Sequence, residues 1–140
     1  MIETFAKIVL AEGVEQAISL MLDKIKNGIF PAKDRKSLIT AITAIQKATI
    51  KTRNFITDSG YQRNEELTDL WHDALNKVVE ANIEDNLPEY LYQKAKFWGE
   101  PKQWILSPET LELIPKLSYI DEKCDMLMLE VKKGSNGMRF

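Results

Sequence analysis

A run of 26 residues from Lys33 to Asp58, free of glycine and proline, constrains the fold of this chain more than any other feature. Apolar and small residues recur along it at spacings of three and four, the pattern of a helix with one buried face. That face consists of Leu38, Ala41, Ile42, Ile45, Thr49, Thr52 and Ile56, and the opposite face of Lys36, Thr40, Lys47, Lys51 and Asn54. We therefore predict a helix about 39 Å long that begins near Pro31 and ends at Ser59-Gly60.

Other segments repeat this helical spacing, and none shows a convincing strand alternation. They cover residues 14–25, ended by Asn27-Gly28; 65–81, capped by Asn64; 87–98, closed by Gly99; and 118–133, opened by a Ser118–Asp121 capping box and stopped by Gly134. A chain of 140 residues fits one domain. The sequence predicts an all-α fold, a single-domain antiparallel bundle of four to six helices over residues 1–134, followed by a flexible C-terminal tail at 135–140.

Composition bears on the cellular location of the protein and on the cofactors that it can bind. Cys124 is the only cysteine, so it cannot form a disulfide within the chain or contribute to a cysteine-rich metal site. The first residues include Glu3 and only a short apolar stretch at 8–11, which does not fit a secretion signal. No run approaches the roughly 20 apolar residues that span a bilayer. We expect a cytoplasmic protein with no membrane association, no cofactor and no metal.

Charge is distributed unevenly along the chain. Nine basic and two acidic residues lie between Lys24 and Arg63, whereas acids predominate from Asn64 to Glu130. Lys33, Arg35, Lys36, Lys47, Lys51 and Arg53 form a basic ridge on the long helix. Such a ridge can follow a nucleic-acid backbone, although no aromatic residue is interleaved to stack on bases. The favoured interpretation is a solvated face whose lysines pair with the acidic face of the neighbouring helix at 65–81.

Five of the twelve aromatic residues fall within residues 90–104, at Tyr90, Tyr92, Phe97, Trp98 and Trp104. Tryptophan and tyrosine dominate the energetics of many protein interfaces, so this segment is a candidate partner surface. The favoured interpretation is a hydrophobic plug that holds the segment on the bundle, and the third alternative is a small-molecule pocket. In each case Lys94 and Lys96, which lie beside these rings in the sequence, are placed to make cation–π contacts with them.

Several apolar residues lie outside the main stripes of their helices. Ile39 and Ile50 share one side of the long helix, and Met126 and Leu129 lie off the stripe of the last helix. A helix that is apolar on more than one side contacts two neighbours, either within the chain or in another protein. These four residues therefore indicate a docking surface or an oligomer, while a central helix of the bundle would give the same pattern.

His72 is the only histidine and shares a helix face with Asp69 and Asn76. This trio is the one arrangement suited to base catalysis, but no nucleophile accompanies it, and a solvated histidine is the favoured interpretation. HEPN ribonucleases, a family of helical proteins, carry an arginine shortly before a histidine. Here eight residues separate Arg63 from His72, so that motif is not matched. The sequence also lacks phosphate-binding loops and hydrolase motifs, and we assign no catalytic residue.

The preferred hypothesis is a non-enzymatic helical module for protein–protein interaction. It would act as an accessory or adaptor subunit that docks its aromatic segment, with Ile39 and Ile50, onto another protein or a second copy of itself. The second hypothesis is nucleic-acid binding through the basic ridge. The third is a helical-bundle nuclease or another enzyme centred on His72. The identity of a partner, a pathway and the packing order of the helices do not follow from the sequence.

Overall fold

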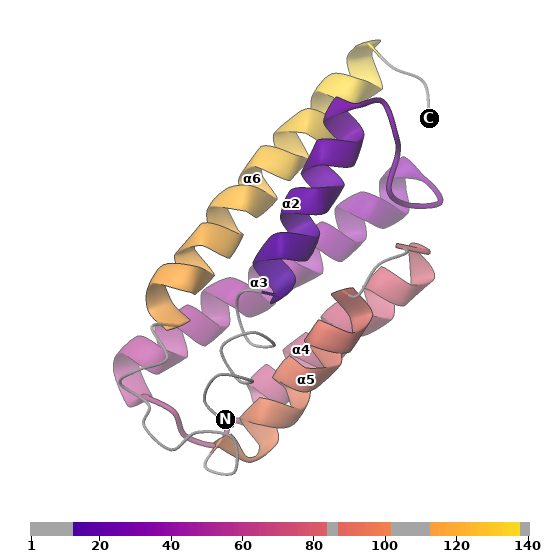
Figure 1. Ribbon diagram of the computed structural model, residues 1–140. Helices are drawn as coiled ribbons and strands as arrows, with labels where there is room; N and C mark the ends of the chain where they lie inside the picture. Colours follow the sequence, from indigo (N-terminus) through magenta and orange to yellow (C-terminus); the bar gives the residue numbers. More distant parts are fainter. Residues whose placement is uncertain (1–12, 84–86, 102–112, 138–140) are drawn as a thin grey trace.

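A computed structural model describes residues 13–83, 87–101 and 113–137 of the chain, with side chains of the last range described from 117 to 132. These ranges hold five helices and no strand (Figure 1). The helices are α2 (Gly13–Lys26), α3 (Arg35–Ser59), α4 (Glu65–Glu80), α5 (Leu87–Gly99) and α6 (Leu113–Gly137). The all-α bundle expected from the sequence is confirmed.

The helices form a ring in which each contacts two neighbours. Going round it, α3 contacts α4, α4 contacts α5, α5 contacts α2, α2 contacts α6, and α6 returns to α3. Helices that follow one another in the sequence run in opposite directions. Because five is odd, one neighbouring pair must be parallel, and Figure 1 shows that this pair is α2 and α6.

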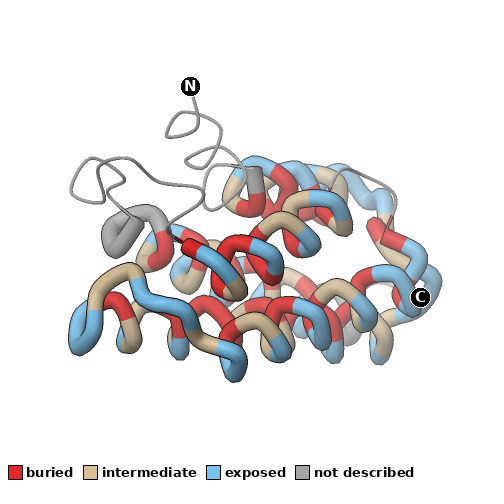
Figure 2. The backbone as a smooth tube through the Cα atoms, turned by 90° about the horizontal axis from the view of Figure 1, so that it is seen from below, coloured by how far each residue is buried: buried red, intermediate tan, exposed pale blue. Residues whose placement is uncertain are grey.

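The sequence stripe of α3 is the centre of the core. Every residue assigned to its apolar face is buried, and every residue assigned to the opposite face is exposed. Figure 2 shows the same division throughout the bundle, with buried residues on the inward sides of the helices. Fully burying one leucine or isoleucine contributes about 1.5–3 kcal/mol, so these apolar faces are the main stabilising feature of the fold.

Two helix ends follow the sequence prediction closely. Asn64 caps α4, with its side-chain oxygen accepting a 3.0 Å hydrogen bond from the backbone N–H of Leu67. Gly60 ends α3 with a φ of 73°, a conformation that glycine adopts without steric cost. The Asn64 backbone N–H also donates to the Trp98 carbonyl at 2.9 Å, which ties the start of α4 to the end of α5.

Two other ends differ from the sequence prediction. The long helix begins at Arg35, not near Pro31, because Asp34 is the cap and accepts the Ser37 N–H at 2.7 Å. Helix α6 begins at Leu113, five residues before Ser118, and continues beyond Gly134 to Gly137. Asp121 therefore lies inside α6, where it contacts α3 instead of capping a helix. Residues 1–12, including the short apolar stretch at 8–11, lie outside the described ranges.

Candidate functional site

The aromatic segment is divided between the core and the surface. Phe97 and Trp98 are buried, with their rings edge to face at 5.0 Å between centroids, so neither can serve as an exposed docking residue in this fold. Tyr90 is half-buried against the core and Tyr92 is exposed. Trp104 lies outside the described residues. For Phe97 and Trp98, the partner-surface assignment is corrected to that of a hydrophobic plug, since both fill space between helices.

Ile39 and Ile50 are both half-buried on α3, and Ile39 packs against the core. Both lie on the same side of α3 as Gln46, which contacts α6. Their off-stripe position is thus consistent with a helix that has neighbours on two sides within the chain. Little of their apolar surface remains for an outside partner.

The outer face of α6, by contrast, leaves large apolar side chains in solvent. Tyr119, Met126 and Leu129 are 52%, 46% and 55% exposed. Met126 follows Tyr119 by seven residues and Leu129 follows Met126 by three, so all three lie on one face of the helix. Tyr119 was missed in the sequence because the helix was expected to start only one residue before it. We call these three residues the α6 face.

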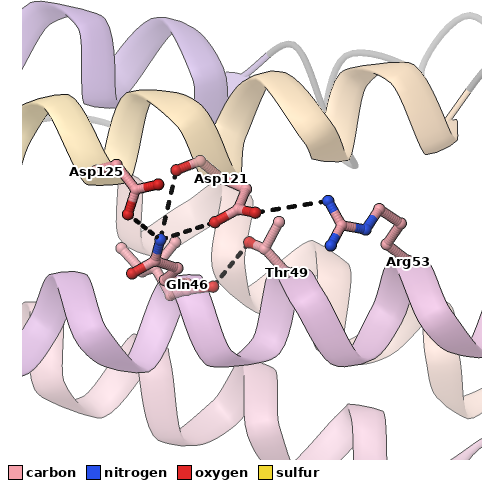
Figure 3. Close-up of polar contacts among 6 residues, drawn as sticks. Gln46, Thr49, Arg53, Asp121 and Asp125 are labelled. Carbon is pink, nitrogen blue, oxygen red and sulfur yellow. Dashed lines mark hydrogen bonds and ion pairs between the residues drawn. The ribbon is translucent and has the colours of Figure 1, made fainter.

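A polar network joins α6 to α3 (Figure 3). The Gln46 side-chain amide donates to Asp121 Oδ1 at 2.7 Å and to Asp125 Oδ1 at 2.8 Å. Arg53 forms an ion pair with Asp121 at 3.5 Å. A hydrogen bond to a charged group contributes about 1.5–3 kcal/mol, so these bonds add to the buried apolar stripe of α6 in keeping the same side of the helix toward the core.

Some residues of the basic ridge are exposed to solvent, and others are partly buried or contact a neighbouring helix. Lys33, Lys36, Lys47 and Lys51 are exposed on the outer side of α3 and its N-terminal connection. Arg53 instead points toward α6, as Figure 3 shows. Arg35 is half-buried, and its Nε atom is buried with no hydrogen-bond partner. Neither arginine therefore belongs to the exposed ridge.

The expected pairing of the ridge with α4 is not observed at contact distance. Within the described part of the chain, no ion pair joins α3 to α4, and the interhelical pair of Arg53 is with α6. The reason is geometric, since the lysines project outward while the α3–α4 contact is made by the apolar stripes. Between the start of α3 and the end of α4 lies a groove of about 250 Å³ lined by Lys33, Asp34, Lys36, Ser37, Thr40, Lys77 and Glu80.

Lys94 is the least expected residue of the core. It is 1% exposed, on the inward side of α5, with Nζ 4.6 Å from the centroid of the Trp71 ring. The Trp71 indole N–H in turn donates to Thr52 Oγ1 at 2.9 Å. Burial lowers the pKa of Lys94 from 10.5 to about 7, because the charged ammonium loses its hydration. Lys96 contacts Tyr92, a ring of the aromatic segment, as expected, whereas Lys94 contacts Trp71 of α4 and not a ring of its own segment.

The three residues considered for base catalysis, Asp69, His72 and Asn76, are all exposed on α4. His72 is exposed and its ring meets that of Tyr92 at 6.2 Å, edge to face. In the described residues no hydrogen bond joins His72 to Asp69 or Asn76, and no cluster of three metal-binding side chains is present. Cys124 is buried, and burial together with the Asp121 and Asp125 carboxylates raises the pKa of its thiol to about 12.

Comparisons of the chain with family models, with curated proteins and with solved structures found no match. Among the helices of the described ranges, none combines the length and apolar character needed to cross a lipid bilayer. The surfaces of the molecule that can contact a partner are chiefly the α6 face and the exposed lysines of α3.

Proposed function

We propose that this protein is a non-enzymatic helical interaction module that associates through the α6 face. The observation that carries the proposal is the group of large apolar side chains, each about half exposed, on one side of α6. Exposed apolar residues gathered on one side of a helix are typical of protein contact sites, and tyrosine and methionine are enriched in them. The aromatic segment contributes through the exposed Tyr92 at most, because Phe97 and Trp98 are buried.

The partner we propose is a second copy of the chain. A two-fold axis brings the same patch of both copies together, so an apolar stripe along one helix is complementary to itself. The stripe reaches from Tyr119 to Leu129, about 15 Å along the helix axis, which suits helix-on-helix packing. The exposed, unpaired geometry of His72 and the buried thiol of Cys124 support the non-enzymatic part of the proposal.

The experiment measures molar mass by light scattering over a wide range of protein concentration. We expect the native chain to form a dimer and the M126E/L129E variant to remain monomeric. The matched control is L20E/V79E, which alters two similarly exposed apolar residues on α2 and α4 and should still dimerise. Circular dichroism confirms that each variant is folded. A native chain that stays monomeric at every concentration, or a dimer unaffected by M126E/L129E, refutes the proposal.

A further inference from the structure

We infer that the solvent face of α3 binds the phosphate backbone of a nucleic-acid duplex. This face consists of Lys36, Thr40, Thr43, Lys47, Lys51 and Asn54, all of which are exposed. It lies on a different helix from the α6 face, so the inference does not depend on the proposed function. The chain as a whole carries a formal charge of −2, but the local field at a surface determines which ligands it attracts.

The composition of the α3 face matches one class of ligand. Its side chains are lysines, threonines and an asparagine, which are residues that commonly contact phosphate oxygens. No acidic residue lies on α3 between its cap, Asp34, and Asp58 near its end. No large apolar or aromatic side chain interrupts the face, whereas an interface with an acidic protein would be expected to contain such an anchor. Phosphates therefore fit this surface better than a protein partner does.

The tertiary structure extends the face beyond α3. The groove at the start of α3 brings Lys77 of α4 beside Lys33 and Lys36, together with the hydroxyls of Ser37 and Thr40. Two acids, Asp34 and Glu80, also line it. The Asp34 carboxylate is engaged in capping, and its pKa is lowered by hydrogen bonds from the Ser37 backbone and side chain and by the charges of Lys33 and Lys36. Lysines still outnumber acids in the groove.

The shape and chemistry of the face favour a duplex over a single strand. Lys36 and Lys51 are fifteen residues apart, about 22 Å along the axis, which is less than one turn of B-DNA at about 34 Å. A straight helix can therefore lie against the backbone of a rigid duplex. Binding of single strands relies on aromatic side chains that stack on unpaired bases, and this face has none. The contacts are to phosphate, so binding should be independent of sequence.

The test is fluorescence anisotropy with a labelled DNA duplex of about 20 base pairs in about 50 mM salt. At physiological salt we expect a Kd of about 10⁻⁴ to 10⁻⁶ M, as for sequence-independent binding, and in about 50 mM salt we expect tighter binding. If the four exposed lysines Lys33, Lys36, Lys47 and Lys51 each contact one phosphate, the logarithm of the association constant should fall against the logarithm of salt concentration with a slope of about −3.6. The K47Q/K51Q variant should bind about tenfold more weakly or worse, and its slope should change to about −1.8.

The control variant is K26Q/K96Q, which removes the same charge from exposed lysines on α2 and α5 and should bind like the native chain. Absence of duplex binding at low salt overturns the inference. Equal losses in K47Q/K51Q and in K26Q/K96Q would also overturn it, because binding would then follow net charge and not the α3 face. Tighter binding of a single strand of the same sequence, or of a polyglutamate peptide, would contradict the assignment to a duplex backbone.

Discussion

Replacing Lys94 with methionine should make the protein more stable at neutral pH and remove much of the pH dependence of that stability. Lys94 is buried between α5 and α4, with the Trp71 ring 4.6 Å from its Nζ atom. In the described part of the chain no carboxylate is close enough to form an ion pair with it. Methionine has a similar length and flexibility and fills core space without a charge. The substitution therefore removes the buried amine while leaving the packing nearly unchanged.

The magnitude follows from the pKa of the buried amine. Burial lowers it from 10.5 to about 7, so between these values the unfolded chain binds a proton that the native chain releases. The free energy of unfolding therefore rises with pH across this window. Each pKa unit corresponds to roughly 1.4 kcal/mol, so burying the charged amine destabilises the native chain by about 5 kcal/mol, and this cost is present in full only below pH 7. From pH 7 to pH 9 the free energy of unfolding should increase by about 2 kcal/mol. The Trp71 ring favours the charged form of Lys94 by about 0.5–2 kcal/mol. This contact reduces the expected increase in the free energy of unfolding between pH 7 and pH 9 to about 1–2 kcal/mol.

The assay is urea denaturation followed by tryptophan fluorescence at pH 7, 8 and 9. The K94M variant should exceed the native chain in stability at pH 7, and this difference should shrink by about 1–2 kcal/mol at pH 9. The K96M variant serves as control, since Lys96 is exposed on the same helix, and it should follow the native chain within about 0.5 kcal/mol. Native and K94M stabilities that change in parallel from pH 7 to pH 9 would show that Lys94 does not titrate in this range.

Two further predictions concern other parts of the core and a helix end. Burial and the carboxylates of Asp121 and Asp125 raise the pKa of the Cys124 thiol to about 12. Cys124 should therefore react with a thiol reagent at pH 8 only after the protein is unfolded in urea. Rapid labelling of the native chain would contradict its burial. The N64A variant should lose about 1 kcal/mol of stability through the cap of α4, seen as a lower urea midpoint with an unchanged slope. The N76A variant, an exposed substitution within the same helix, should shift the midpoint little.

Structural features that depend on residues close together in the sequence were predicted correctly, whereas a feature that depends on distant residues was not. The buried stripe of α3, the cap at Asn64 and the helix end at Gly60 were all predicted correctly, because spacing and backbone preferences act within a few residues. The start of α6 was not. A capping box at Ser118 and Asp121 satisfies the local rule, yet in the fold the Asp121 carboxylate accepts from Gln46, 75 residues earlier in the chain.

The candidate sites show the same division. The exposure of Lys36, Lys47 and Lys51 followed from the amphipathic pattern of one helix. The burial of Phe97 and Trp98 did not, because aromatic residues serve equally in cores and at interfaces, and only the neighbouring helices decide between these roles. Lys77 could not be assigned to the basic groove for a similar reason, since its place there depends on the end of α4 lying beside the start of α3.

By itself, then, the sequence determined the helices of this protein, their inward faces and the lysine-bearing side of α3. Periodicity encodes these properties, because the 3.6-residue repeat assigns each side chain to one side of its own helix. The tertiary structure alone decided which helices became neighbours, which pair runs parallel, and which apolar residues stayed in solvent. Lys94 illustrates the physical reason: its burial against Trp71 depends on how α4 and α5 pack, and no pattern within either helix specifies that contact.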